Sequence, residues 1–271
     1  MIEPVIHWQA VQYSIPEHSF IYFIQDFEPG FYPWSSKYVM AESTYQSSLS
    51  KIAIFNSSLL MKYMEQKGYA FPCSYCFEPT LNKSLAAHLQ QNAHFIKEKQ
   101  ILIYGRPSTP RNAFELIVMA LRKWSAMQTD ISEWKIYSAG EPHPDIELCG
   151  GAYLQSLGKL SLRDYARLLG KAYMGISLMV SPHPSYPPLE MASFGVKTIT
   201  NMFSPKDLST FSKNIVSLRS CNEMDIANAL HSLADQYSTA SDVVVDLDSD
   251  YVTNTTAFSE ICSAMAKEIW L

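Results

Sequence analysis

Glu190 is the residue of this 271-residue chain whose chemistry most needs an explanation. An apolar run, Gly175–Val180, is followed by a proline-rich polar loop and then by a short predicted helix. Pro188 suits the first helical position, so Pro187 is the expected cap residue. A strand end, a polar loop and a helix N-terminus together form a site for an anion. The Glu190 carboxylate could complement the helix dipole, or it could accept hydrogen bonds from sugar hydroxyls such as those of a ribose.

Two arginines, Arg106 and Arg111, flank the predicted start of a helix over residues 110–124. Arg111 would lie in the first turn, where a cation opposes the helix dipole unless an anion is nearby. Two guanidinium groups that converge there could hold a diphosphate through bidentate hydrogen bonds, with Asn112 facing the same region. The alternative is that one or both arginines face solvent or pair with Glu115.

His183 and Asp26 are the candidate catalytic residues. His183 stands between two prolines, so it could act at a fixed geometry in catalysis or phosphate binding, or it could tie its loop to the backbone. Asp26 and Glu28 follow a predicted strand, and one of them could act as a general base or cap the turn. The seven histidines show no metal-ligand spacing, and the chain has no GxGxxG, P-loop or GxSxG motif.

Strand and helix patterns alternate after residue 100, which predicts a parallel sheet with helices on both faces. Ligands in such folds bind beyond the carboxyl ends of the strands, where loops 105–109, 138–143 and 181–187 would collect. Residues 69–98 show no strong periodicity and are predicted to be a connection. The predicted strands are 20–25, 51–55, 101–104, 134–137, 153–160, 175–180, 196–200 and 214–217, and the predicted helices are 36–49, 58–67, 110–124, 162–171, a short helix from 188, 223–237 and 256–271.

Composition and charge narrow the class of protein. The chain is 47% hydrophobic and 17% charged, which is enough to form a packed core, and its net charge of −5 does not suggest a nucleic-acid partner. No apolar run approaches the ~20 residues of a membrane span, and the N-terminal residues do not resemble a signal peptide. The pair Cys73 and Cys76 has CxxC spacing, but we interpret the five cysteines as ordinary thiols of a cytoplasmic protein rather than as a redox or zinc site.

The chain resembles the donor-binding half of GT-B glycosyltransferases of the GT4 type over residues 18–235. The likeness is carried by Leu157-Gly158-Lys159-Leu160-Ser161 before a helix and by a Pro/Ser loop that leads to Leu189-Glu190-Met191-Ala192. The strings Tyr104-Gly-Arg-Pro…Arg111-Asn-Ala-Phe and Ser181-Pro-His-Pro-Ser-Tyr-Pro-Pro-Leu-Glu look most like the WsaF-type rhamnosyltransferases of surface-glycan synthesis.

The resemblance implies a nucleotide-diphosphate sugar as donor, such as dTDP-rhamnose, and a glycan or lipid-linked glycan as acceptor. It implies no metal and no further cofactor, and it is compatible with peripheral association at the inner face of the membrane. Arg106 and Arg111 would hold the diphosphate, and Glu190 would bind the ribose. The remaining expected contacts are Asn112, Ser185, Tyr186 and Leu189 at the diphosphate, and Gly140, Lys159 and Leu160 near the base.

The sequence departs from the general GT4 pattern at two positions. Pro182 stands where the family has the earlier of two glutamates, and Asn112 stands at the usual lysine position. We expect an α/β, GT-B-like fold with one complete Rossmann-like donor domain, residues 96–240. A shortened N-terminal α/β segment, residues 1–95, would precede it, and a tail, residues 241–271, would pack back on that segment. The alternative to an active glycosyltransferase is a non-catalytic nucleotide-sugar-binding module or a truncated inactive fragment.

Overall fold

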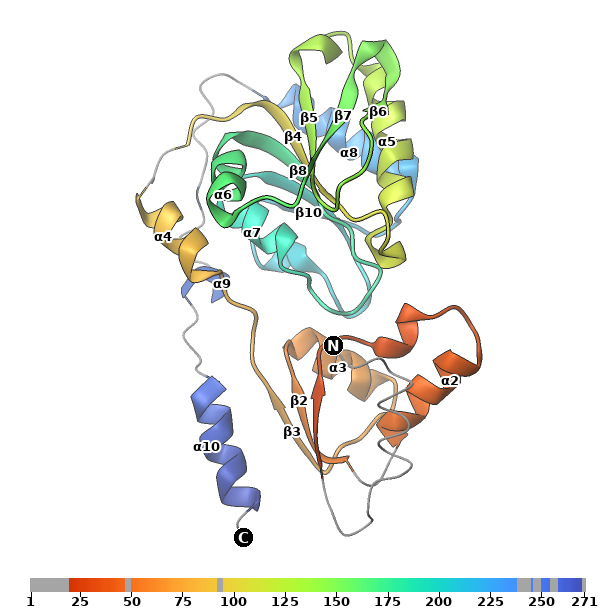
Figure 1. The fold of residues 1–271 in the computed structure, drawn as a ribbon, viewed down its shortest axis with the longest axis vertical. Helices are drawn as coiled ribbons and strands as arrows, with labels where there is room; N and C mark the ends of the chain where they lie inside the picture. The colour runs from red at the N-terminus through yellow and green to blue at the C-terminus, as the bar shows by residue number, and fades with distance from the viewer. Residues whose placement is uncertain are drawn as a thin grey trace.

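The computed structural model describes residues 20–46, 50–91, 95–237, 245, 250–253 and 258–269. It contains two sheets, which form the centres of a small and a large domain (Figure 1). The strands of the small domain are β1 (Phe20–Ile24), β2 (Ser50–Phe55) and β3 (Cys73–Cys76), and those of the large domain are β4 (Glu98–Gly105), β5 (Lys135–Gly140), β6 (Ile146–Glu147), β7 (Tyr153–Gly158), β8 (Ala172–Ile176), β9 (Lys197–Asn201) and β10 (Ile215–Leu218).

The helices are close to the predicted ones after residue 160. The α-helices are α2 (Ser36–Ser43), α3 (Ser58–Gln66), α4 (Lys83–Gln91), α5 (Phe114–Met127), α6 (Leu162–Lys171), α7 (Pro187–Ser193), α8 (Glu223–Asp235), α9 (Asp250–Thr253) and α10 (Phe258–Ile269). The 3₁₀ helices are η1 (Glu28–Phe31), η2 (Thr44–Gln46), η3 (Pro110–Asn112), η4 (Ile131–Glu133), η5 (Cys149–Gly151) and η6 (Leu208–Thr210). Ser161 and Asn222 cap α6 and α8 through their side chains, as predicted.

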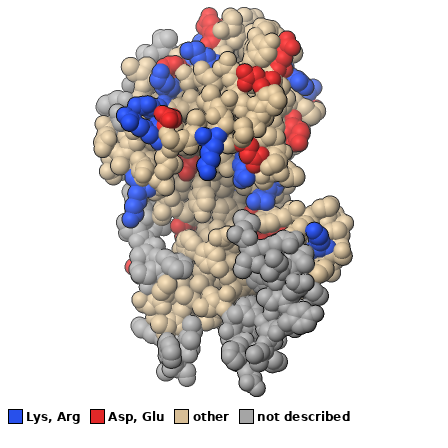
Figure 2. Space-filling model, in the orientation of Figure 1, with Lys and Arg blue, Asp and Glu red and all other residues tan. Residues whose placement is uncertain are grey.

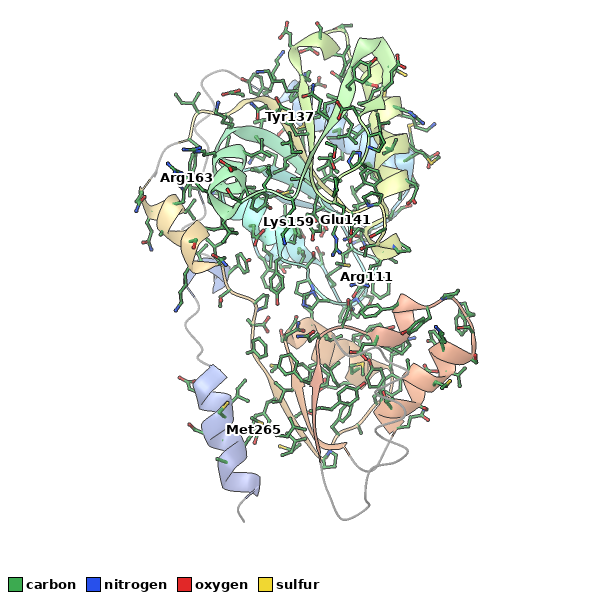
Figure 3. The ribbon with its side chains drawn as sticks, in the orientation of Figure 1. Arg111, Tyr137, Glu141, Lys159, Arg163 and Met265 are labelled. Carbon is green, nitrogen blue, oxygen red and sulfur yellow. The ribbon has the colours of Figure 1, made fainter. Side chains whose placement is uncertain are left out.

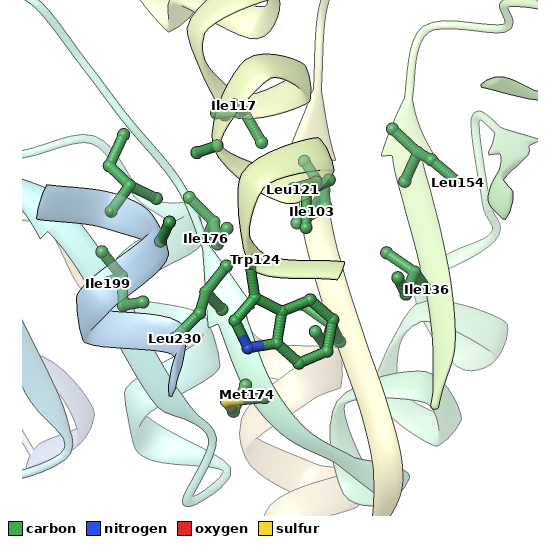
Figure 4. Packing of buried hydrophobic residues seen from close by; sticks show 14 of the residues in the cluster. Ile103, Ile117, Leu121, Trp124, Ile136, Leu154, Met174, Ile176, Ile199 and Leu230 are labelled. Carbon is green, nitrogen blue, oxygen red and sulfur yellow. The ribbon is translucent and has the colours of Figure 1, made fainter. Parts of the chain in front are cut away.

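The large sheet has the strand order β10-β9-β8-β4-β5-β7-β6, and its pairs are parallel except for β6 with β7. Helices cover both faces. On one face α5 and α8 enclose an apolar core around Trp124, which is fully buried (Figure 4). On the other face α4, α6 and α7 pack around a second core that includes Leu85, Leu169 and Phe194. The predicted doubly covered parallel sheet is therefore confirmed.

The small domain has three parallel strands in the order β1-β2-β3. Its core is aromatic, with Tyr22, Tyr45 and Phe55 buried beside α3. The helix α10 packs on this sheet, since Ile261 and Met265 contact Ile54. None of the helices in the described ranges is long and apolar enough to cross a membrane.

Four local predictions are wrong. Residues 69–98 are not a featureless connection, because they contain β3 and α4. The predicted helix over 110–124 is two helices, since Ala113 has a left-handed conformation with φ of 50° between η3 and α5. The predicted strand over 175–180 ends at Ile176, because β8 loses its partner strands there. Tyr186, and not Pro187, precedes the first residue of α7.

Candidate functional site

A pocket of about 490 Å³ opens at the carboxyl ends of β4, β5 and β7 in the large domain. This is the edge of the sheet where the alternating pattern predicted a ligand. Six of the predicted site residues line it, together with residues that the sequence did not indicate, and Figure 3 labels one of each, Lys159 and Glu141. The predicted lining residues are Arg106, Gly140, Lys159, Leu160, Tyr186 and Glu190, and the others are Tyr104, Ala139, Glu141, Leu162, Tyr165 and Pro187.

The floor of the pocket depends on the close approach of two glycines. Gly105 ends β4 and Gly140 ends β5, and they are paired in register. Gly140 has φ of 144°, and a Cβ there would lie 2.3 Å from the carbonyl oxygen of Gly105. The same carbonyl accepts a hydrogen bond of 2.8 Å from the backbone N–H of Glu141. Only glycine at position 140 allows this close approach, because any side chain there would clash with the Gly105 carbonyl oxygen. The ends of β4 and β5 can therefore lie side by side at the pocket.

Arg106 is oriented by a carboxylate from the neighbouring strand end. Its Nε donates to Glu141 Oε1 at 3.1 Å, and the second oxygen of Glu141 accepts from the backbone N–H of Ser108 at 2.9 Å. The hydrogen bond from Ser108 and the Arg106 guanidinium hold the pKa of Glu141 below its usual range, so this carboxylate is ionised. The pair thus fixes Arg106 at the pocket wall, and its partner is Glu141 rather than Glu115.

Glu190 lines the pocket with a carboxyl group whose charge is poorly solvated. Burial raises the pKa of Glu190 to about 7, and the Tyr165 hydroxyl beside it acts in the opposite direction. Tyr165 and Tyr186 line the same pocket. A carboxyl group that faces a cavity, and whose ionised form is destabilised by burial, is typical of a ligand-binding position. Two or more hydroxyl donors would stabilise its ionised form.

Arg111 and Asn112 lie outside this pocket. In η3, Arg111 places Nε 3.6 Å from Asp26 Oδ2, and its guanidinium lies 4.1 Å from the ring centroid of Phe31. Both partners belong to the small domain, so Arg111 bridges the two domains. Asn112 is buried and its Nδ2 donates to the carbonyl of Leu178 at 3.1 Å, which ties η3 to the segment after β8.

Asp26 joins the carboxyl end of β1 to the large domain. One of its oxygens accepts hydrogen bonds from the Ser181 hydroxyl and from the backbone N–H of Phe27, and the other faces Arg111. Ser181 in turn accepts from the backbone N–H of His183 at 3.1 Å. The carboxyl ends of both sheets therefore meet at Asp26. This residue caps the turn after β1 and also joins the small domain to the large one.

His183 is buried within the same contact region. Its Nδ1 accepts from the backbone N–H of Ser185 at 2.9 Å, so the neutral ring carries its proton on Nε2, which has no hydrogen-bond partner among the described residues. Burial lowers the pKa of His183, and the charges of Lys206 and Arg111 add to this while Asp26 opposes it. The ring is thus neutral near pH 7, with a buried N–H group available to a ligand.

The other predicted contacts differ in their exposure. Ser185 is buried with φ of 67°, and Leu189 is buried in the second core. Tyr186 is 40% exposed, and its ring contacts His183 with centroids 5.6 Å apart. Tyr186 therefore connects the pocket to the region around His183.

Lys206 was missed by the sequence analysis. It is fully buried, and its Nζ donates to the carbonyl of Met179 at 2.6 Å. Burial lowers the pKa of Lys206 to about 7, and the charge of Asp26 acts in the opposite direction. Its position in the loop after the strand 196–200 was the available signal, because that loop also lies at the carboxyl edge of the sheet.

Models of one protein family match both parts of the chain. The model of the WsaF C-terminal domain matches residues 99–231, and that of the WsaF N-terminal domain matches residues 2–58. The chain belongs to the WsaF family. It is also 30% identical over 181 residues to the O-antigen biosynthesis protein RfbC of Myxococcus xanthus, a match that covers 66% of this chain and 14% of that protein.

Solved structures identify the fold of this WsaF-family chain. Sucrose-phosphate synthase from Thermosynechococcus elongatus matches with 13% identity and a TM-score of 0.62 over 98% of this chain and 70% of its own. Anabaena HepE in complex with UDP and glucose matches with 11% identity and a TM-score of 0.62 over 98% and 74%. TarM matches with 9% identity and a TM-score of 0.64 over 97% and 53%. These neighbours are GT-B glycosyltransferases, so the chain has the GT-B fold, as the sequence resemblance implied.

Proposed function

We propose that this WsaF-family chain transfers a sugar from a nucleotide-diphosphate donor to a surface-glycan acceptor. The observation that carries the proposal is the pocket in which Arg106, Lys159 and Glu190 converge from three separate segments of the chain. Two cations and one poorly solvated carboxylate suit a ligand that combines phosphates with a ribose diol. The GT-B neighbour HepE, which was crystallised with UDP and glucose, supports the choice of a nucleotide donor.

The chemistry of the lining residues is the reason for placing the donor in this pocket. Glu190 would accept hydrogen bonds from the ribose hydroxyls, and Arg106, held by Glu141, would face the diphosphate. Lys159 and Leu160 would lie beside the base. The leaving diphosphate would be stabilised by Arg106, which Glu141 holds in place, with no metal or further cofactor required. The sequence resemblance makes dTDP-rhamnose the first donor to test, and a GT4-like glycan or lipid-linked acceptor at the cytoplasmic membrane face the first acceptor.

Asp26 is the proposed general base. Its carboxylate accepts a hydrogen bond from Ser181 and faces Arg111. The donor diphosphate would compete for Arg111, and the released carboxylate oxygen could then accept the proton of the acceptor hydroxyl. In that step the acceptor oxygen bonds to the anomeric carbon as the bond from that carbon to the diphosphate breaks. His183 Nε2, which is buried and has no partner within the part of the chain that the structure describes, would donate a hydrogen bond to the nucleotide sugar.

Calorimetric titration with dTDP, UDP and dTDP-rhamnose tests the donor site. Arg106→Ala should weaken nucleotide binding by roughly 1.5–3 kcal/mol, the scale of a hydrogen bond to a charged group. Arg167→Ala is the matched control, since Arg167 is an exposed arginine on α6 that pairs with Asp164. Equal nucleotide affinity in folded wild type and Arg106→Ala would refute this site.

A further inference from the structure

An exposed aromatic ring, that of Trp34, lies against the half-buried ring of Tyr38 at the start of α2 on the small domain. Trp34 and Tyr38 are stacked with centroids 4.9 Å apart and planes 22° from parallel. Trp34 is 89% exposed, and Val39, which follows Tyr38 in the sequence, is 62% exposed. We call these three residues the Trp34 surface. A large aromatic ring that is held in water by a stacked partner points to a binding role more than an isolated exposed residue does.

Helix capping accounts for only part of this arrangement. Ser35 caps α2 by accepting from the backbone N–H of Tyr38, and a residue before the cap often packs on the first turn. Such packing buries the residue, whereas Trp34 keeps most of its surface in water. Tyr38 is also fixed from below, because its ring meets Phe27 at 6.5 Å and its hydroxyl donates to Glu42 at 3.4 Å. The Trp34 indole is therefore stacked on a Tyr38 ring that Phe27 and Glu42 hold in place.

The Trp34 surface follows closely in the sequence on a residue of the interdomain contact. Phe31, three residues before Trp34, lies under the guanidinium of Arg111. The segment begins in η1, directly after the carboxyl end of β1 that faces the large domain, and α2 follows on the outer side of the small domain (Figure 1). Trp34 therefore follows, on one short segment, a residue that contacts the large domain.

The charge around this surface suits a neutral ligand. Lys37 is the only charged residue between positions 29 and 41 in the sequence. The described surface of the small domain is largely uncharged in the view of Figure 2, in contrast to the large domain. Binding to an anionic membrane normally uses a cluster of basic residues, which this segment lacks. A pyranose ring fits better, because its C–H face packs on an aromatic ring while its hydroxyls stay hydrated.

We propose that the Trp34 surface binds a neutral sugar unit of the acceptor glycan, with the C–H face of the pyranose stacked on the indole of Trp34. This inference rests on the proposed glycosyltransferase function and adds an acceptor subsite on the small domain. The subsite lies away from the donor pocket, so it contributes to the binding of an oligosaccharide and not to that of a nucleotide.

Fluorine NMR of the full chain labelled with 5-fluorotryptophan tests the subsite. The Trp34 signal is assigned from its loss in Trp34→Phe, and the probes are a rhamnose trisaccharide, maltotriose and phosphatidylglycerol vesicles. We expect a trisaccharide to shift the Trp34 signal and the vesicles to leave it unchanged. Trp34→Ala should weaken trisaccharide binding about tenfold, the scale of one aromatic contact, while Trp34→Phe retains most of it.

Two results would overturn the subsite. One is a Trp34 signal that neither trisaccharide moves, and the other is a signal that moves with vesicles alone, which would assign the surface to a membrane. Calorimetry with dTDP on the same samples separates this inference from the proposed function. Nucleotide binding without trisaccharide binding refutes the subsite alone, whereas the absence of nucleotide binding refutes the donor site.

Discussion

If Glu190 binds the ribose as proposed, its carboxyl group gives donor binding a specific pH dependence. Burial raises the pKa of Glu190 to about 7, so the ionised form, which would accept hydrogen bonds from the ribose hydroxyls, is lost as the pH falls through 7. We expect the affinity for a nucleotide sugar to decrease by up to tenfold for each pH unit below about 7. Calorimetry with dTDP-rhamnose measures this well, because its esterified phosphates stay ionised throughout the range.

Glu190→Gln provides the control for this dependence. The amide keeps the shape of the side chain but does not titrate, so the variant should bind more weakly at pH 8 and with an affinity that hardly changes with pH. If Glu190→Gln retained the wild-type pH profile, another group would be responsible and the ribose role of Glu190 would be wrong.

Among the secondary-structure elements, the paired ends of β4 and β5 decide whether the pocket exists. Gly140→Ala would place a methyl group 2.3 Å from the Gly105 carbonyl oxygen, which belongs to the backbone and cannot rotate away. We expect this variant to lose more than about 2 kcal/mol of unfolding free energy and to lose nucleotide binding, because the strand ends that carry Arg106 must separate.

Gly151→Ala separates this effect from ordinary backbone strain. Gly151 has φ of 74°, yet a Cβ there would have nothing within 4 Å. It should therefore cost only about 1 kcal/mol and leave nucleotide binding intact. Equal losses of stability in the two variants, measured by urea unfolding, would show that the contact between the strand ends is unimportant.

The elements of the large domain could be predicted because their apolar runs alternate regularly with capped helices. The break at Ala113 could not, since nothing in its sequence requires a left-handed alanine, and the surrounding packing decides it. The strand β3 was missed for a similar reason. Its four residues carry no alternating pattern and become a strand by pairing with β2.

The candidate site, like the fold, could be predicted only in part from the sequence. Arg106, Lys159 and Glu190 follow or precede recognisable elements, and the structure brings them into one pocket. Glu141 and Tyr165 were missed as lining residues because their contribution depends on the packing of neighbouring elements. Arg111 was expected in the first turn of a helix that begins at Pro110. In the structure α5 begins at Phe114, so Arg111 lies before it and reaches the small domain instead of the pocket.

In the molecule as a whole, Arg111 has two possible partners, Asp26 and the donor diphosphate. If they compete, Asp26→Asn should tighten donor binding by about fivefold, since a partly exposed ion pair contributes roughly 1 kcal/mol, and it should reduce turnover. Arg111→Ala should weaken donor binding, and adding Asp26→Asn to it should have no further effect. Asp26→Asn that weakens donor binding as much as Arg111→Ala would contradict this competition.

Two buried lysines, Lys97 and Lys206, make the stability of the whole chain depend on pH. Burial lowers the pKa of each to about 7, from 10.5 in the unfolded chain. Above pH 7 the unfolded chain binds more protons than the folded one, so the free energy of unfolding should rise with pH, by up to about 1.4 kcal/mol per pH unit for each lysine. The buried carboxyls of Glu28 and Glu190, whose pKa values are raised to about 7, have the opposite sign below pH 7. The protein should therefore be least stable near neutrality.

Lys97→Met tests this linkage by urea unfolding between about pH 7 and pH 8.5. Lys97 donates to the carbonyls of Leu169 and Phe194 at 2.8 Å each, so the two α-helices α6 and α7 are joined through its ammonium group. Methionine keeps the length of the side chain without a titrating group, and about half of the lysine-dependent increase should disappear. The control is Lys171→Met, because Lys171 is an exposed lysine at the end of α6 and should leave the increase unchanged. An equal rise in wild type and Lys97→Met would mean that Lys97 stays charged in the core through its two carbonyl partners.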